Sequence, residues 1–165
     1  PDVIDRALLS LKSNDFPIYY LSPRGVKLDA QISTSISKLD GMTLVCGKYE
    51  GVDERVIKHY NMIEISIGDY ILSGGDLAAM VLIDSVVRCL PNVLGNPLTL
   101  NEESFTNHLL EYPLYTQPRE WKNYKVPDVL LSGDHKKIKN WKIKQSEDIT
   151  MKRRPDLWKK YLKLK

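Results

Sequence analysis

The chain has 165 residues, of which 42% are hydrophobic and 27% are charged, with a formal net charge of +3, so we expect one folded core and a small appended module. It contains no apolar run near the ~20 residues of a membrane helix and no pattern of a secretory signal. These two exclusions predict a cytoplasmic protein.

The N-terminal half alternates β-rich runs with helical patterns. It opens at Pro1, without an initiating methionine, on a helical pattern over residues 3–11, so we expect a longer protein whose N-terminus is missing here. The alternation predicts a βαβαβα arrangement with a parallel sheet. The expected strands are residues 17–21, 42–46 and 62–67, and the expected helices are residues 29–39, 53–59 and 76–90.

Each expected strand ends in a polar or glycine-rich turn, at residues 22–25, 47–51 and 68–75. In parallel sheets, ligands bind beyond the carboxyl ends of the strands, so these turns are predicted to form one site. Glycines there would let the backbone approach a ligand closely, although any one of them alone could be simple turn chemistry. The glycines concerned are Gly47, Gly68, Gly74 and Gly75.

The expected helix over residues 76–90 is apolar around nearly its whole circumference, which is typical of a helix buried between a sheet and a second surface. Asp84 and Arg88 are its polar exceptions, and their i,i+4 spacing allows an intrahelical salt bridge. In a buried ion pair, the attraction between the charges rarely offsets the free-energy cost of desolvating them. This pair would also leave some N–H donors of the Arg88 guanidinium without an acceptor. A ligand or a second subunit is therefore the alternative partner.

The C-terminal part is more basic. Residues 91–107 form a long connecting segment with two prolines and four asparagines, and two basic helices are predicted at residues 134–146 and 155–162. Residues 134–165 hold twelve Lys or Arg and four Asp or Glu, a net of +8, which leaves −5 for the rest. A polyanion contact and a solvated helical face explain this charge equally well.

Several standard sites are excluded by pattern. There is no P-loop and no G-x-G-x-x-G fingerprint, and no Ser-His-Asp or Cys-His neighbours indicate covalent catalysis. The histidines lack companions at metal-ligand spacing, so no metal site is predicted. Cys46 and Cys89 are far apart and are expected to be reduced, buried thiols. A pocket of glycines, aromatics and carboxylates remains.

Seven segments, in order along essentially the whole chain, resemble those of the bacterial tRNA (guanine-N-1)-methyltransferases. The resemblance implies an α/β fold of the SPOUT class, in which a parallel sheet with helices on both faces contains a deep trefoil knot, an exception to the rule that chains do not thread loops. A small helical C-terminal domain would follow. The segments are residues 20–25, 44–56, 66–75, 84–88, 93–95, 129–135 and 153–155.

The resemblance also implies three parts of the chain. These are a knotted catalytic domain that binds S-adenosylmethionine at residues 1–94, an interdomain linker at residues 95–109, and a basic helical tRNA-binding domain at residues 110–165. The family's first strand and glycine-rich loop precede this region, so we expect both to be missing. The implied reaction transfers a methyl group from S-adenosylmethionine to N-1 of guanosine 37, just 3′ of the anticodon, and supports reading-frame maintenance. A role for Mg²⁺ is not readable from the sequence.

Fourteen residues match the cofactor loops of the family. Glu50 would lie near the methionine moiety of S-adenosylmethionine, whose ammonium is a suitable partner for a carboxylate. The implied cofactor pocket consists of Tyr20, Leu21, Ser22, Gly47, Tyr49, Glu50, Ile67, Gly68, Asp69, Tyr70, Ile71, Leu72, Gly74 and Gly75.

Guanine N-1 carries a proton at neutral pH, so its methylation needs a general base and a donor that stabilises negative charge on O6. Arg88 matches the family arginine assigned to O6. The family's base is an aspartate in the linker, and Glu103 stands at the matching position with one more methylene, which changes its reach. Glu102 is the alternative base, or a simple acidic residue of the loop.

In the resembling family the cofactor is held by one subunit and the linker base comes from the other, so we expect a homodimer with its active site at the interface. Two rivals remain. A knotted methyltransferase acting on a ribose 2′-OH would need a base near a hydroxyl rather than an acidic linker. A non-enzymatic RNA-binding module would explain the basic tail, but it would not explain the pocket of glycines and aromatics.

Overall fold

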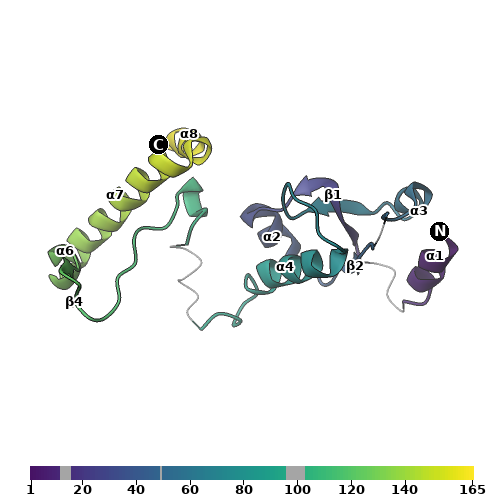
Figure 1. The fold of residues 1–165 in the computed structure, drawn as a ribbon, viewed down its shortest axis with the longest axis horizontal. Helices are drawn as coiled ribbons and strands as arrows, with labels where there is room; N and C mark the ends of the chain where they lie inside the picture. The colour runs from purple at the N-terminus through teal and green to yellow at the C-terminus, as the bar shows by residue number, and fades with distance from the viewer. Residues whose placement is uncertain (12–15, 49, 96–102) are drawn as a thin grey trace. The chain divides into compact units, whose positions relative to one another are not determined.

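The computed structural model describes residues 1–11, 16–48, 50–95 and 103–165, and divides the chain into two compact units, Pro1–Gly95 and Asn96–Lys165 (Figure 1). Two of the expected site residues, Tyr49 and Glu102, lie outside the described residues, together with residues 96–101 of the expected linker. Within the described part, no helix is long and apolar enough to cross a membrane.

Unit 1 is built on a three-stranded parallel sheet with β1 in the centre, in the order β2-β1-β3. The three strands lie where the sequence predicts them, so the expectation of a mixed α/β fold with a parallel sheet is confirmed. Tyr19, Tyr20 and Leu21 are all buried, as expected for a central parallel strand that is covered on both faces. The strands are β1 Ile18–Lys27, β2 Thr43–Val45 and β3 Ile63–Ser66.

Each face of the sheet packs against its own pair of helices, because successive side chains of a strand point to opposite sides. Tyr19 and Leu21 join a cluster with residues of α2 and α4, whereas Tyr20 joins a second cluster with residues of α1 and α3. Figure 1 shows α2 beside α4 and α1 beside α3. The helices are α1 Asp2–Leu9, α2 Ala30–Ile36, α3 Glu54–His59 and α4 Gly75–Val87.

Aspartates begin the two short helices that connect the strands. The Asp29 carboxylate accepts the Ile32 N–H at 2.9 Å at the start of α2, and the Asp53 carboxylate accepts the Arg55 N–H at 2.8 Å at the start of α3. Each bond satisfies a backbone donor that the helix itself leaves without a partner. Hydrogen bonds from Arg55 also hold the pKa of Asp53 well below its usual value.

Helix α4 differs from its expected form. The sequence predicts burial around its whole circumference, but in the described chain only one face is covered, and Leu82 at the centre of that face is fully buried. The opposite face exposes large apolar side chains, so the second covering surface that the sequence leads us to expect is not supplied by the described part of this chain. The exposed apolar residues of α4 are Leu77, Met80, Val81, Ile83 and Val87.

Unit 2 is organised around α7, His135–Arg153, which continues seven residues beyond the predicted end at residue 146. The extension contains Thr150, whose fully buried hydroxyl donates to the Ser146 carbonyl at 2.6 Å and accepts the Leu110 N–H at 2.8 Å.

Helix α8, Pro155–Leu162, has the predicted bounds. The other elements are η1 Thr106–His108, the hairpin of β4 Glu120–Trp121 and β5 Tyr124–Lys125, which the sequence did not predict, and α6 Asp128–Leu131.

Candidate functional site

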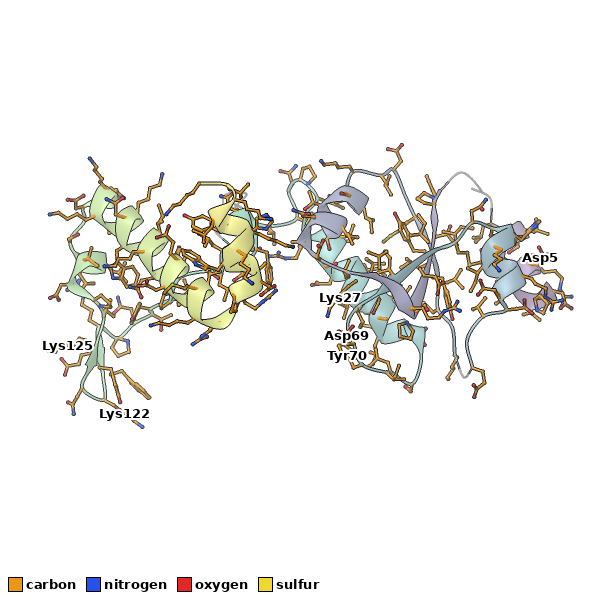
Figure 2. All side chains as sticks on the ribbon, turned by 90° about the horizontal axis from the view of Figure 1, so that it is seen from above. Asp5, Lys27, Asp69, Tyr70, Lys122 and Lys125 are labelled. Atoms are coloured by element: carbon orange, nitrogen blue, oxygen red, sulfur yellow. The ribbon has the colours of Figure 1, made fainter. Side chains whose placement is uncertain are left out.

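A cavity of about 440 Å³ lies at the carboxyl end of the sheet in unit 1, within the size range of small-molecule sites. Twelve of the fourteen expected cofactor residues line it. Asp69 does not, because its carboxylate points to the surface and pairs with Lys27 at 3.1 Å, next to Tyr70 (Figure 2). The twelve are Tyr20, Leu21, Ser22, Gly47, Glu50, Ile67, Gly68, Tyr70, Ile71, Leu72, Gly74 and Gly75.

The first wall of the cavity is an excursion within β1, where the sequence predicted a turn after the strand. Leu21 and Val26 both pair with Ile65, so residues 22–25 leave the sheet and the strand then resumes. Gly25 makes this possible, because a Cβ at that position would collide with the backbone of Glu64 and Ile65. The excursion places Ser22 and Arg24 in the wall of the cavity.

The second wall is the loop after β2, which wraps around the ring of Tyr20. The Val52 N–H donates to the Tyr20 hydroxyl at 3.2 Å. A Cβ on Gly47 would lie 3.1 Å from the same hydroxyl, and one on Gly51, where φ is +99°, would lie 3.0 Å from it. The two glycines therefore let the backbone approach the aromatic ring closely.

The loops after β2 and β3 are joined by backbone contacts. The Gly75 N–H donates to the Gly47 carbonyl at 2.8 Å, and Lys48 and Gly74 form an antiparallel bridge. Cys46 lies exposed at this junction and Cys89 is half-buried, so the expectation of two buried thiols is wrong. Strand β2 ends at Val45, which leaves Cys46 outside the packed sheet.

The third wall is the loop after β3, and it is held by its own hydrogen bonds. The Ser66 hydroxyl donates to the Gly68 carbonyl at 3.1 Å and accepts the Gly68 N–H at 3.2 Å, and the Tyr70 hydroxyl donates to the Ile67 carbonyl at 3.3 Å. Tyr70 and Ile71 are largely exposed at the rim. The wall thus offers apolar contact area to a ligand.

Sequence reasoning missed three charged residues of the lining, namely Lys48 and the pair formed by Arg24 and Glu54. The Arg24 guanidinium donates to the carboxylates of Glu54 at 3.1 Å and of Glu64 at 3.2 Å, which lowers the pKa of Glu54 and raises that of Arg24. Both residues of this pair belong to segments that carry the family resemblance. Their pairing spans 30 residues of sequence, however, so no local pattern could reveal it.

The two expected catalytic residues do not line the cavity of their own chain. Arg88 is the C-cap of α4, roughly 20 Å along the helix axis from Gly75, where the cavity lies. Glu103 belongs to unit 2 and is half-buried. Among the described residues, no group of three or more His, Cys, Asp or Glu could hold a metal ion.

The backbone around Glu103 is strained. Phe105, Asn107 and His108 have φ values of 80°, 51° and 61°, in a region that side chains rarely adopt. The Phe105 N–H donates to the Leu109 carbonyl at 2.6 Å, which closes the turn. Strain of this kind persists only where surrounding contacts enforce it, and it clusters at functional sites.

Comparisons with known proteins agree over nearly the whole chain. A family model described as "tRNA (Guanine-1)-methyltransferase TrmD" matches residues 1–160. A protein named tRNA (guanine-N(1)-)-methyltransferase from Pelagibacter ubique (strain HTCC1062) is 54% identical over 162 residues, covering 98% of this chain and 71% of that protein. Proteins of the same name from Rhodospirillum rubrum and Ehrlichia canis are 51% and 49% identical, covering 98% and 94% of this chain and 68% of each relative.

The contact between the loops predicts that alanine substitution at two adjacent glycines has different effects on stability. A Cβ on Gly75 would lie 2.9 Å from the Cys46 Cα and 3.1 Å from the Gly47 nitrogen, so we expect Gly75→Ala to cost about 1–3 kcal/mol. Gly74 is extended, and its nearest neighbour would be 3.7 Å away, so Gly74→Ala should change stability by less than about 0.5 kcal/mol. Urea unfolding of both variants measures the difference. Equal stabilities would contradict the close packing at Gly75.

Proposed function

Because this chain belongs to the tRNA (guanine-1)-methyltransferase family, we propose that the cavity of unit 1 binds S-adenosylmethionine and that the enzyme methylates N-1 of guanosine 37, the guanosine just 3′ of the anticodon. The observation that carries the proposal is the convergence of the three loops on one cavity. We further propose that the chain threads these loops in the trefoil knot of the SPOUT class.

The lining of the cavity fits this cofactor. Gly47 and Gly74 leave backbone in the wall, and Ile67 and Leu72 supply apolar surface for a flat heterocycle. Glu50 contributes a carboxylate for the ammonium of the methionine moiety. The chemistry that bound S-adenosylmethionine supplies is a methyl group on a sulfonium centre, which is attacked by a nucleophilic nitrogen.

The chain's own task is to generate that nucleophile at guanine. Glu103 accepts the N-1 proton, so the electron pair left on N-1 can form the new bond to the methyl carbon while the bond from carbon to sulfur breaks. Arg88 donates hydrogen bonds to O6, where negative charge grows as the proton leaves. The half-buried position of Glu103 and the strained turn that follows it support a held, pre-oriented carboxylate.

A homodimer built on α4 would complete the site. Leu77, Val81, Asp84 and Arg88 follow i, i+4, i+7, i+11 spacing, so Arg88 shares the exposed apolar face of the helix. A two-fold axis through the middle of α4 pairs the helices antiparallel and brings Arg88 of one subunit to the end where the partner's cavity lies. This arrangement resolves the distance of roughly 20 Å between Arg88 and its own cavity.

Unit 2 supplies the attraction for tRNA. Residues 96–165 carry fifteen Lys or Arg and nine Asp or Glu, a net of +6, whereas residues 1–95 carry −3. Lys136, Lys137 and Lys139 lie together in the first turns of α7. A basic surface of this kind contacts the phosphate backbone, so the binding of tRNA should weaken as salt rises.

The direct test uses S-adenosylmethionine with a labelled methyl group and unmodified tRNA. We expect one methyl group per tRNA, located on N-1 of guanosine 37 when the product is digested and its nucleosides are analysed. A label on a ribose 2′-oxygen would replace the proposal with the related knotted class. Binding of tRNA without methyl transfer, and without any effect of S-adenosylmethionine on thermal stability, would favour a non-enzymatic binding module.

The proton transfer can be tested at Glu103. Glu103→Gln keeps size and hydrogen bonding but cannot accept the proton, so the single-turnover rate should fall by roughly 10²- to 10⁴-fold with little change in affinity for S-adenosylmethionine. Glu103→Asp should stay active, because it restores the family's residue. Glu111→Gln, a half-buried carboxylate from the same turn, is the matched control and should keep the full rate.

Glu102→Gln separates the two candidate bases. We expect the Glu102→Gln enzyme to stay near the full rate. An inactive Glu102→Gln enzyme and an active Glu103→Gln enzyme would assign the general base to Glu102.

Arg88→Lys should slow methyl transfer, because an ammonium lacks the planar fork that can hold O6.

The dimer can be tested on the exposed face of α4. Met80 is 64% exposed in the single chain, so Met80→Glu should leave the fold and the affinity for S-adenosylmethionine intact while it separates the subunits and abolishes methylation. Leu9→Glu on α1, at a residue with 62% exposure, is the matched control and should stay dimeric and active. Sedimentation equilibrium measures the state of each protein. An active monomeric wild type would rule out the shared site.

A further inference from the structure

Unit 2 contains a hairpin that the proposed function does not use. The cross-strand pairs are Glu120 with Lys125 and Trp121 with Tyr124, and the intervening turn consists of Lys122 and Asn123. Both turn residues have positive φ, 48° and 66°, as the tightest two-residue hairpin turns require. Beyond the pairs, the Val126 N–H donates to the Arg119 carbonyl at 2.9 Å and closes the base of the hairpin.

The hairpin presents two aromatic rings to solvent. Side chains of directly paired residues lie on the same face, so Trp121 and Tyr124 share one face and the Glu120–Lys125 pair, 3.8 Å apart, takes the other. Trp121 is 60% exposed and Tyr124 is 76% exposed. Figure 2 shows the tip, marked by Lys122 and Lys125, projecting from the helices of unit 2. Large aromatic side chains are usually buried in the protein interior or in an interface, so this exposed face indicates a binding surface.

The charges around the rings indicate which partner fits. The Lys122 ammonium lies 4.8 Å from the centre of the Trp121 ring, whereas Lys125 pairs with Glu120 on the other face of the hairpin. Lysine is depleted in the cores of protein interfaces, whereas aromatic rings interleaved with cations are typical of surfaces that bind single-stranded nucleic acid. The net charge of +6 on residues 96–165 also favours a polyanion.

We propose that Trp121 and Tyr124 form a stacking platform for unpaired bases of the tRNA substrate, with Lys122 beside it to meet a neighbouring phosphate. The inference rests on the proposed function, because it takes the RNA from there. Bases inside an RNA duplex are stacked on each other and enclosed by deep or shallow grooves, so the platform accepts bases of the loop and not of the stem. Its contribution is affinity for the loop that carries the target guanosine.

The test measures binding of the full chain to an anticodon stem-loop RNA and to a blunt RNA duplex of equal length. Trp121→Leu keeps an apolar side chain without a π face, so we expect roughly 5- to 150-fold weaker binding of the stem-loop and unchanged binding of the duplex. Trp121→Phe should restore most of the affinity. Leu114→Ala, at a residue with 68% exposure in the same unit, is the matched control and should bind like the wild type.

Salt titrations separate stacking from charge. Trp121→Leu should leave the slope of log affinity against log salt unchanged, whereas Lys122→Gln should reduce it by about 0.7, the value for one phosphate contact on a single strand. Equal binding of the stem-loop by wild type and Trp121→Leu would overturn the platform. Equal losses in Trp121→Leu and Trp121→Phe would also overturn it, because they would assign the effect to hairpin structure.

The outcomes also separate this inference from the function on which it rests. If the wild type methylates tRNA and the Trp121→Leu variant binds the stem-loop normally, the platform is rejected and the proposed function stands. If the wild type neither binds nor methylates tRNA, both the platform and the proposed function are rejected. Dissociation of the subunits by Trp121→Leu, with unchanged affinity for RNA, would assign the rings to a protein interface instead.

Discussion

The cavity depends on one close backbone contact, between Gly75 and the loop after β2. Strands β2 and β3 lie on opposite sides of β1, so the loops that follow them can meet only across the end of the central strand. They do so through the 2.8 Å hydrogen bond from the Gly75 N–H to the Gly47 carbonyl, at a separation that leaves no room for a Cβ on Gly75. Together with the bridge between Lys48 and Gly74, this contact joins two walls of the cavity.

The same contact fixes the start and the direction of α4. The helix begins at Gly75 and packs along the sheet through a face centred on Leu82, so its far end, at Arg88, is carried away from the cavity. A single subunit therefore cannot place this arginine beside a ligand in its own pocket. The exposed apolar face of α4 lies along the same line of the helix as Arg88. In the proposed enzyme, the dimer contact that buries this face therefore also places Arg88 beside the pocket of the neighbouring subunit.

The sequence predicts well those features that arise from local chemistry. Alternation of apolar runs located the three strands, and the expected helices at residues 29–39 and 53–59 begin at the aspartates that cap α2 and α3 in the structure. The excursion of residues 22–25 was missed, because it depends on how β1 registers with Ile65 of a distant strand. Likewise, burial of α4 could not be judged from its composition alone, since an apolar helix surface looks the same whether its cover comes from this chain or from another. The roles proposed for Arg88 and Glu103 came from family resemblance, because neither residue lines the cavity of its own chain.

The distribution of charge suits the two partners of the proposed reaction. The cofactor is cationic at its sulfonium and ammonium groups, and unit 1, which is proposed to hold it, carries −3, with the Glu50 carboxylate in the lining of the cavity. The RNA is a polyanion, and the unit assigned to it carries +6. If the charges were pooled on one surface, the carboxylates that favour the cofactor would repel the phosphates of the substrate. Separate units allow each attraction to act on its own ligand, and Glu103, the carboxylate proposed to approach guanine, lies near the start of unit 2.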